Sequence, residues 1–369
     1  MSHTTNLAHI SLRLFLGFMA IRLWDAGALA QENLPAVSLA NERIELTIRL
    51  QGGAFSGIGL RDGPESLNPL AAMGHFLCLD GFGQPSPEEK AAGMPFHGEA
   101  SRQKWTASAE RSDGNARSVS LRCSLPLAQE SFSRTLEIVD GESIVYVKSQ
   151  LESWIGVDRP VSWAEHATLG PPFLEKGEVV VDMPATRCRV RAEKPGPIPG
   201  RLIYLQEFLW PMAPVKEGGE ADLRLIPDRK FLDLATCRID PQRKLGFVTA
   251  LQLKRRLLFG YLFRREEYPW LMSWMNYTGD ARAARGMEFS TQPFDISRRE
   301  TVEANPMFGS PTFRWLPAKS KISSSFLLFY TPVPAGFSRV DEITWREGKL
   351  VIEDHSSGTT IVLSASRPL

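Results

Sequence analysis

The fold class is indicated most clearly by one stretch: Ser133-Arg134-Thr135-Leu136-Glu137-Ile138-Val139, then Asp140-Gly141, then Ser143 to Gln150. An Asp-Gly dipeptide between two strand-forming runs supplies the positive φ angles of a tight turn. The stretch therefore predicts an antiparallel β-hairpin.

Runs with strand character continue on both sides of this hairpin. Residues 42–50 alternate apolar and polar side chains with period 2 and stop at Gly52-Gly53. Similar runs are 118–125, 178–181, 187–191, 246–253, 257–263 and 323–330, and a last hairpin joins 349–353 to 359–363. Helical periodicity is almost absent after residue 30, while 26 prolines and 29 glycines are spread along the chain. We expect an all-β protein, a large antiparallel β-sandwich.

The domain organisation follows from the same pattern. Residues 31–338 are expected to form the sandwich, and residues 339–369 a C-terminal hairpin that is part of it or packed on it. Lys194 to Gly200 is the stretch richest in proline and glycine. It is either a long loop within one sandwich, which strands of similar character on both sides favour, or a linker between two domains.

Residues 1–30 differ from the rest of the chain. Arg13 lies within a mostly apolar run that ends at Trp24, and Ala28-Leu29-Ala30 resembles a signal-peptidase site. We expect a signal peptide and an exported protein, periplasmic or extracellular. Because Arg22 and Asp25 oppose insertion, a wrongly assigned start and a single membrane anchor stay open as alternatives, and without a signal peptide the protein is expected in the cytoplasm. The stretch is too short and interrupted to predict a stable membrane span.

Composition limits the partners and the chemistry. The 43 Lys and Arg residues nearly balance 42 Asp and Glu residues, so no basic face for nucleic acid is expected. Phosphate-loop, nucleophile-elbow and zinc-helix motifs are missing, and we expect no metal and no cofactor. Cys78, Cys123, Cys188 and Cys237 are far apart and form no Cys-x-x-Cys pair. Buried free thiols are therefore expected rather than disulfides.

Two segments outside the leader contain a histidine close to an acid. In Phe96-His97-Gly98-Glu99, an extended backbone points His97 and Glu99 to the same side, and Gly98 lets a ligand come close. Glu165-His166 precedes a Pro-Pro pair that ends the strand and leaves His166 near a loop mouth. Either pair can instead be structural. His75 is expected in the core, and His355 in a solvated turn.

The third segment of interest is Arg285-Gly286-Met287-Glu288-Phe289-Ser290. Period 2 puts Met287 and Phe289 on the core face and Glu288 on the opposite face, between the small Gly286 and Ser290. This arrangement leaves a carboxyl group with space above it for a ligand. An ordinary solvent-facing strand residue is the alternative.

Together these segments resemble the galactose mutarotase-like (aldose 1-epimerase-related) proteins, over about residues 40–335. The resemblance rests on Phe96-His97-Gly98-Glu99 with Trp105 downstream, on Glu165-His166 before Leu169-Gly170-Pro171-Pro172-Phe173, and on Gly286-Met287-Glu288-Phe289. It implies a β-supersandwich with a carbohydrate in a concave cleft. It also implies that His166 is a general acid, that Glu288 is a general base, and that His97 binds the sugar.

These residue types suit that chemistry. Interconversion of anomers needs one proton delivered to the ring oxygen and another taken from the anomeric hydroxyl, for which a histidine and a carboxylate serve. Burial of Glu288 would raise its pKa and strengthen it as a base. Sugar C–H faces pack on indole rings, so candidate contacts are Trp105, Trp163, Trp270 and Trp274. Core packing is the alternative for each.

One part of the family pattern is missing. The enzymes that best define the family supply an arginine before the first histidine, and here Cys78 to Pro85 contains none. Asp80 and Glu99 are candidates for hydroxyl contacts, and Asp233 is a weaker one. The alternatives to an isomerase are a sugar-binding protein with little catalysis and, third, a glycoside hydrolase or lyase that pairs Glu288 with Glu99 or Asp80.

Overall fold

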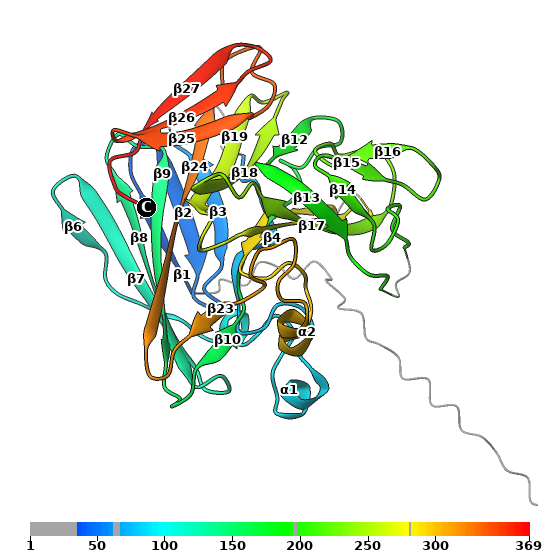
Figure 1. Cartoon of the computed structure of the whole chain (residues 1–369). Helices are drawn as coiled ribbons and strands as arrows, with labels where there is room; N and C mark the ends of the chain where they lie inside the picture. The colour runs from blue at the N-terminus through cyan, green and yellow to red at the C-terminus, as the bar shows by residue number, and fades with distance from the viewer. Residues whose placement is uncertain (1–34, 62–66, 195–197, 280–281) are drawn as a thin grey trace, which may run out of the picture. The chain divides into compact units, whose positions relative to one another are not determined.

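The predicted hairpin is present in the computed structural model of the chain (Figure 1). It consists of β8 (Glu130–Val139) and β9 (Ile144–Ser153), which pair antiparallel, and Gly141 in the turn has a φ of +81°. The structure describes residues 35–61, 67–194, 198–279 and 282–369. The predicted signal peptide, residues 1–30, lies outside the described residues.

Two large antiparallel sheets contain most of the described strands. The first has the order β1 (Ala36–Ala40), β2 (Ile44–Arg49), β3 (Phe55–Leu60), β4 (Leu70–Leu79), β11 (Trp163–Leu169), β21 (Ala284–Gly286), β20 (Trp270–Asn276), β17 (Leu232–Ile239), β13 (Ala185–Val190), β14 (Glu207–Leu209), with β22 (Glu288–Ser290) between β11 and β20. The second has the order β12 (Val179–Asp182), β18 (Leu245–Gln252), β19 (Leu257–Arg264), β24 (Lys321–Pro332), β9, β8, β7 (Ala116–Leu125), β5 (Thr106–Ala107), with β6 (Arg111–Asp113) beside β7.

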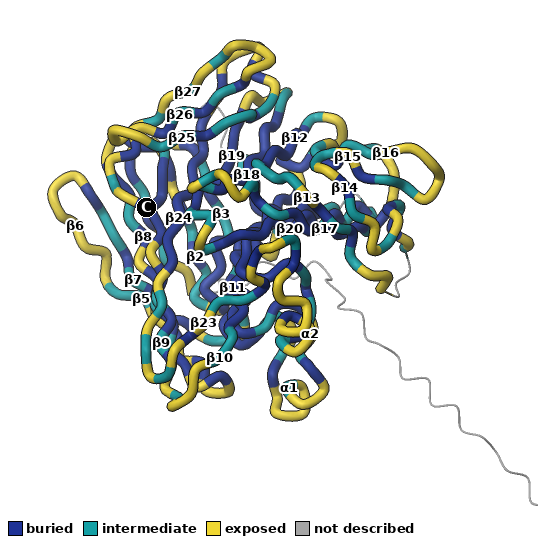
Figure 2. The backbone as a smooth tube through the Cα atoms, viewed as in Figure 1, coloured by how far each residue is buried: buried dark blue, intermediate teal, exposed yellow. Residues whose placement is uncertain are grey.

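The main core lies between these two sheets. Phe289 of β22 stacks on Phe263 of β19 with ring centroids 4.3 Å apart, and Tyr261 of β19 contacts His75 of β4. The strands are mostly buried, whereas the turns that join them are exposed (Figure 2). The all-β sandwich predicted from the alternating pattern is confirmed.

A third sheet covers the outer face of the second. It consists of β25 (Glu342–Arg346), β26 (Lys349–Asp354) and β27 (Thr359–Ser364), drawn in orange and red in Figure 1. Ile343, Leu350 and Ile352 of this sheet pack in one apolar cluster with Phe247 and Leu262 of the second sheet. The C-terminal segment thus has three strands where the sequence predicted a hairpin. The other outer face of the sandwich belongs to the first sheet, and the third sheet does not cover it.

Short elements line the edges of the sandwich. The helices α1 (Pro87–Ala91) and α2 (Arg298–Glu303) each begin with a serine capping box, and a 3-10 helix, η1, spans Ala100–Arg102. Two-stranded ribbons are formed by β10 (Arg159–Val161) with β23 (Arg314–Leu316), and by β15 (Met212–Pro214) with β16 (Glu220–Asp222). Among the described residues, no helix has the length and apolar content needed to cross a membrane.

The cysteines required one correction. Cys188 of β13 and Cys237 of β17 lie opposite each other in the first sheet and form a disulfide, with their Cα atoms 4.0 Å apart. The prediction of free thiols is wrong for this pair, because strand pairing brings together cysteines that are 49 residues apart in the chain. Cys78 and Cys123 are buried free thiols, as predicted. The stretch from Lys194 to Gly200 joins β13 to β14, two strands that pair in one sheet.

Candidate functional site

His166 and Glu288 lie side by side on the outer face of the first sheet. Thr168 of β11 pairs with Gly286 of β21, and Ala164 pairs with Ser290 of β22, so the same register sets His166 opposite Glu288. Nε2 of His166 lies 3.6 Å from Oε1 of Glu288. Because side chains alternate along a strand, the two residues share a face that points away from the main core.

Space for the Glu288 carboxyl group comes from Gly286. A Cβ atom on Gly286 would lie 2.3 Å from Oε1 of Glu288 and 3.1 Å from the Cβ of Trp274. Glu288 is only 1% exposed, and its Oε1 has no hydrogen-bond partner among the described residues. A buried acceptor of this kind costs free energy unless a proton or a ligand satisfies it.

Aromatic rings fix the orientation of His166. Phe76 of β4 stacks on the imidazole, with ring centroids 4.4 Å apart and an interplanar angle of 19°. Trp274 of β20 approaches edge-on at 6.1 Å. Nδ1 of His166 lies 3.0 Å from Oγ1 of Thr168, which leaves Nε2 as the nitrogen that faces Glu288. Nε2 of His166 is therefore positioned by packing and by one hydrogen bond.

His97 approaches this pair from a turn. Its φ is +67°, and its ring centroid lies 5.4 Å from that of His166. The backbone N–H of Gly83 donates to Nδ1 of His97 over 3.1 Å, and the N–H of His97 donates to the Gly83 carbonyl over 3.0 Å. Because Nδ1 accepts, the neutral ring carries its proton on Nε2, which can donate to a ligand. The structure thus brings His97, His166 and Glu288 together.

Burial changes the protonation of all three groups. It raises the pKa of Glu288 well above its ordinary value, and the negative charge of Asp295 adds to the rise. Burial lowers the pKa of His166 to about 3, and it lowers the pKa of His97 well below its ordinary range. Both imidazoles are therefore neutral at neutral pH. Because the pKa of Glu288 is raised and the pKa of His166 is lowered, a single proton shared by the two residues lies on Glu288.

Asp295 is a second carboxyl group near Glu288, and no sequence motif indicated it. Its Oδ2 lies 2.6 Å from Nζ of Lys194 and 3.2 Å from Nη1 of Arg191. Its Oδ1 is buried and has no partner among the described residues. The two basic partners are about 100 residues away in the chain, so no local pattern could have indicated this cluster.

The acids predicted to contact a sugar have structural partners instead. Oδ2 of Asp80 pairs with Arg298 of α2 at 2.8 Å, and Oε2 of Glu99 accepts a hydrogen bond from the Ala128 N–H at 2.8 Å. Asp233 accepts hydrogen bonds from the backbone at 201 and 202. The predicted extended segment at Glu99 is wrong, because the backbone turns just before it and η1 follows. These carboxylates hold loops in place.

The predicted tryptophan contacts also need correction. Trp105 and Trp270 are fully enclosed, and their indole N–H groups donate to the carbonyls of Ala100 and Pro311, at 2.9 and 2.8 Å. Core packing, the alternative considered for each of them, is what the structure shows, and Trp163 is enclosed in the same way. Trp274 is half-buried and lies on the His166 face.

Glu165 and His75 form a separate polar cluster in the main core. Oε1 of Glu165 lies 2.5 Å from Nη2 of Arg134, and its Oε2 lies 2.9 Å from Nε2 of His75. Burial opposes ionisation, but Arg134 and His75 together lower the pKa of Glu165 to about 2. Glu165 is therefore a structural anion on the opposite face from His166. His75 is a satisfied core side chain and His355 is exposed, both as predicted.

Comparison with solved structures identifies the fold. A galactose mutarotase related enzyme from Lactobacillus acidophilus matches with a TM-score of 0.56 at 12% identity, over 80% of this chain and 97% of that one. A galactose mutarotase-like protein from Clostridium acetobutylicum matches with a TM-score of 0.57 at 14% identity, over 81% and 95%. The chain has the galactose mutarotase-like fold.

The same fold occurs in a protein of Escherichia coli K12 named as a candidate aldose 1-epimerase, with a TM-score of 0.55 at 10% identity, over 81% of this chain and 99% of that one. No protein-family model matches the sequence, and no curated protein matches it either. Among the residues that the structure describes, no three His, Cys, Asp or Glu side chains gather as they would around a metal ion.

Proposed function

We propose that this protein is an isomerase of the aldose 1-epimerase type, which interconverts the α and β anomers of a sugar. The observation that supports this most strongly is the His166–Glu288 pair, with 3.6 Å between Nε2 and Oε1 on a face bordered by aromatic rings. The galactose mutarotase-like fold supports a carbohydrate as the substrate class.

The reaction opens and closes the pyranose ring. The bond from C1 to the ring oxygen breaks while that oxygen gains a proton, and the anomeric hydroxyl loses its proton to become the carbonyl oxygen. Rotation about the C1–C2 bond and the reverse steps give the other anomer. Protons gained and lost balance, so the site needs one donor and one acceptor that hold one proton between them. His166 acts as the donor and Glu288 as the acceptor.

Substrate binding sets the starting position of the shared proton. A sugar hydroxyl that donates to the unpartnered Oε1 of Glu288 stabilises the ionised carboxylate, so the proton passes to Nε2 of His166. The neutral His97 donates from Nε2 and orients the sugar, while Phe76 and Trp274 offer apolar faces to its C–H groups. The proposed roles thus rest on Oε1 of Glu288 and on Nε2 of His166 and of His97.

NMR or polarimetry of freshly dissolved α-glucose and α-galactose tests this proposal. The protein should accelerate the approach to anomeric equilibrium, and His166→Gln should reduce that acceleration by about 10²-fold or more, the usual contribution of an acid–base group. His355→Gln changes an exposed histidine and should leave the rate unchanged. A wild-type protein that accelerates the anomerisation of neither sugar would contradict the proposal for these two substrates.

A second candidate function is sugar binding with little catalysis. It is favoured by the lack of an arginine between Cys78 and Pro85 and by the burial of His166, which is 6% exposed. Sugar-dependent thermal stabilisation without faster anomer exchange would support it. Glycoside hydrolysis or lyase chemistry is not favoured, because both candidates for a second acid have structural partners. Asp80 pairs with Arg298, and Glu99 accepts from the Ala128 N–H.

We also propose that the protein is exported. The Cys188–Cys237 disulfide supports this, because such bonds persist in oxidising compartments and are rare in the cytosol. Cell fractionation with mass spectrometry of the N-terminus tests the proposal. A processed chain in the periplasm or medium is expected, whereas an unprocessed chain confined to the cytosol would contradict it.

A further inference from the structure

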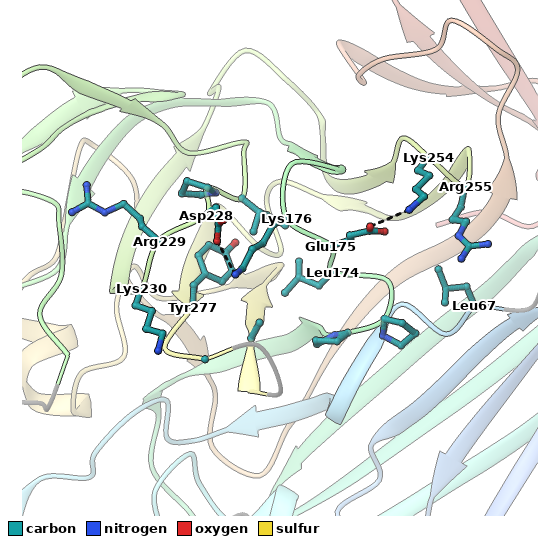
Figure 3. Close-up of a pocket in the computed structure, with 16 residues that line it drawn as sticks. Leu67, Leu174, Glu175, Lys176, Asp228, Arg229, Lys230, Lys254, Arg255 and Tyr277 are labelled. Atoms are coloured by element: carbon teal, nitrogen blue, oxygen red, sulfur yellow. Dashed lines mark hydrogen bonds and ion pairs between the residues drawn. The ribbon is translucent and has the colours of Figure 1, made fainter.

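A second place of interest is a pocket of about 830 Å³, whose wall residues are drawn in Figure 3. None of His97, His166, Glu288 and Asp295 is among its wall residues. Its walls come from segments at one end of two central strands of the first sheet, where β11 runs into Pro171-Pro172 and β20 runs into Tyr277. The β18–β19 turn at Lys254 completes the wall from the second sheet.

Positive charge is concentrated in this wall. Its described residues include five basic side chains, Lys176, Arg229, Lys230, Lys254 and Arg255, and two acidic ones, Glu175 and Asp228. Lys176 pairs with Asp228 at 2.8 Å, and Lys254 pairs with Glu175 at 3.3 Å, as the dashed lines in Figure 3 show. Arg229 pairs with Glu217, which lies outside the wall, at 2.9 Å. Even with Glu217 counted, the described wall holds more basic than acidic groups, in a chain whose net charge is only +1. Such a concentration attracts anions.

A buried hydroxyl in the wall is the second observation. Tyr277 is 5% exposed, and its hydroxyl makes no hydrogen bond of good geometry with a described residue. The fully buried Arg285 lies next to it and can only donate to the hydroxyl oxygen, so the hydroxyl proton stays available for a ligand. A ligand oxygen that accepts from the Tyr277 hydroxyl would remove the cost of leaving that donor unsatisfied.

We propose that this pocket binds a small organic anion that carries carboxylate or phosphate groups. The basic side chains bind the oxyanion, Tyr277 donates a hydrogen bond, and Leu174 and Ile226 pack against the carbon skeleton. The volume lies in the range that holds drug-sized ligands, so the pocket accommodates more than a single inorganic ion. This site is independent of the proposed epimerase activity.

Calorimetric titration of the full chain with citrate and with pyrophosphate, at constant ionic strength set by potassium chloride, tests the proposal. At least one of the two should bind saturably, and the tighter one shows whether carboxylate or phosphate is preferred. The double variant Lys230→Glu with Lys254→Glu should weaken that binding at least tenfold. Tyr277→Phe should weaken it as well, because phenylalanine cannot donate a hydrogen bond to the anion.

The matched control is the double variant Lys148→Glu with Lys349→Glu, which makes the same charge change on exposed lysines outside the pocket. It should bind as the wild type does. Equal weakening in both double variants would mean general charge attraction and would overturn the site. Absence of saturable binding for both anions would overturn it as well.

Discussion

The main-chain oxygen of Asp295 lies so close to Gly83 that a Cβ atom on Gly83 would be 2.2 Å from it. The N–H of the same glycine holds Nδ1 of His97 at 3.1 Å. Gly83 therefore positions both the imidazole of His97 and the backbone of Asp295, the residue whose charge acts on Glu288.

Replacing Gly83 with alanine should displace Asp295 or His97. Gly83 has a φ of +92°, and Gly218 has a φ of +93° with no atom within 4 Å of the position that a Cβ atom would take. Gly218→Ala thus carries the backbone cost of about 1–3 kcal/mol alone. Chemical denaturation should show a larger loss for Gly83→Ala, and only that variant should slow epimerisation. Equal losses of stability in the two variants would contradict the close contact between Gly83 and the main-chain oxygen of Asp295.

Asp295→Asn should change the pH dependence of kcat/KM. Asp295 raises the pKa of Glu288, so its neutralisation lowers that pKa, and the released charges of Arg191 and Lys194 act in the same direction. In the proposed mechanism the His166–Glu288 pair holds one proton, which is lost on the alkaline limb, so that limb should move to lower pH. The acid limb belongs to His166 and should move less. An alkaline limb that moves upward would contradict this account.

Local geometry explains what the sequence could predict. The alternation around Glu288 was enough to put Met287 and Phe289 in the core and Gly286 beside the carboxyl group, since each follows from one strand. The disulfide between Cys188 and Cys237 depends instead on the pairing of β13 with β17. Contacts between strands distant in sequence carry no such local pattern.

The same reasoning explains the residues that were misassigned. Asp80 lies in a turn just after β4, but whether its carboxyl group meets a ligand or Arg298 depends on where α2 packs. Trp270 points to the outer face in register with Ser290, yet its indole is covered by the loop at Pro311. The sequence around Asp80 does not indicate that α2 packs there, and the sequence around Trp270 does not indicate the loop at Pro311.

Arg134→Met should destabilise the protein by about 3–5 kcal/mol, because it leaves the buried carboxylate of Glu165 without its cation. Arg134 helps to hold the pKa of Glu165 down at about 2, so this contribution is present above the ordinary carboxyl pKa and is lost as the pH falls toward 2. Denaturation at several pH values should therefore show that the difference in the free energy of unfolding between the wild type and Arg134→Met becomes smaller in acid.

The exposed pair of Arg117 with Asp140 provides the control for that experiment. Arg117→Met should cost about 0–1 kcal/mol at every pH, as surface ion pairs do. If Arg134→Met cost no more than Arg117→Met, the core cluster would not contribute to stability as described.

Cysteine alkylation should separate the two kinds of cysteine. In denaturant without reductant, only Cys78 and Cys123 should react with iodoacetamide, since Cys188 and Cys237 are joined. After reduction all four should react. Mass spectrometry counts the added groups, and modification of Cys188 in the unreduced protein would contradict the disulfide.

The most direct test of the His166–Glu288 account is the rate of anomer exchange in Glu288→Gln, measured by NMR on glucose and galactose. Glutamine keeps the shape of the side chain but cannot accept the anomeric proton. If Glu288 is the base, the acceleration should fall by about 10²-fold or more while the protein stays folded. Acceleration equal to that of the wild type would show that Glu288 is not the base.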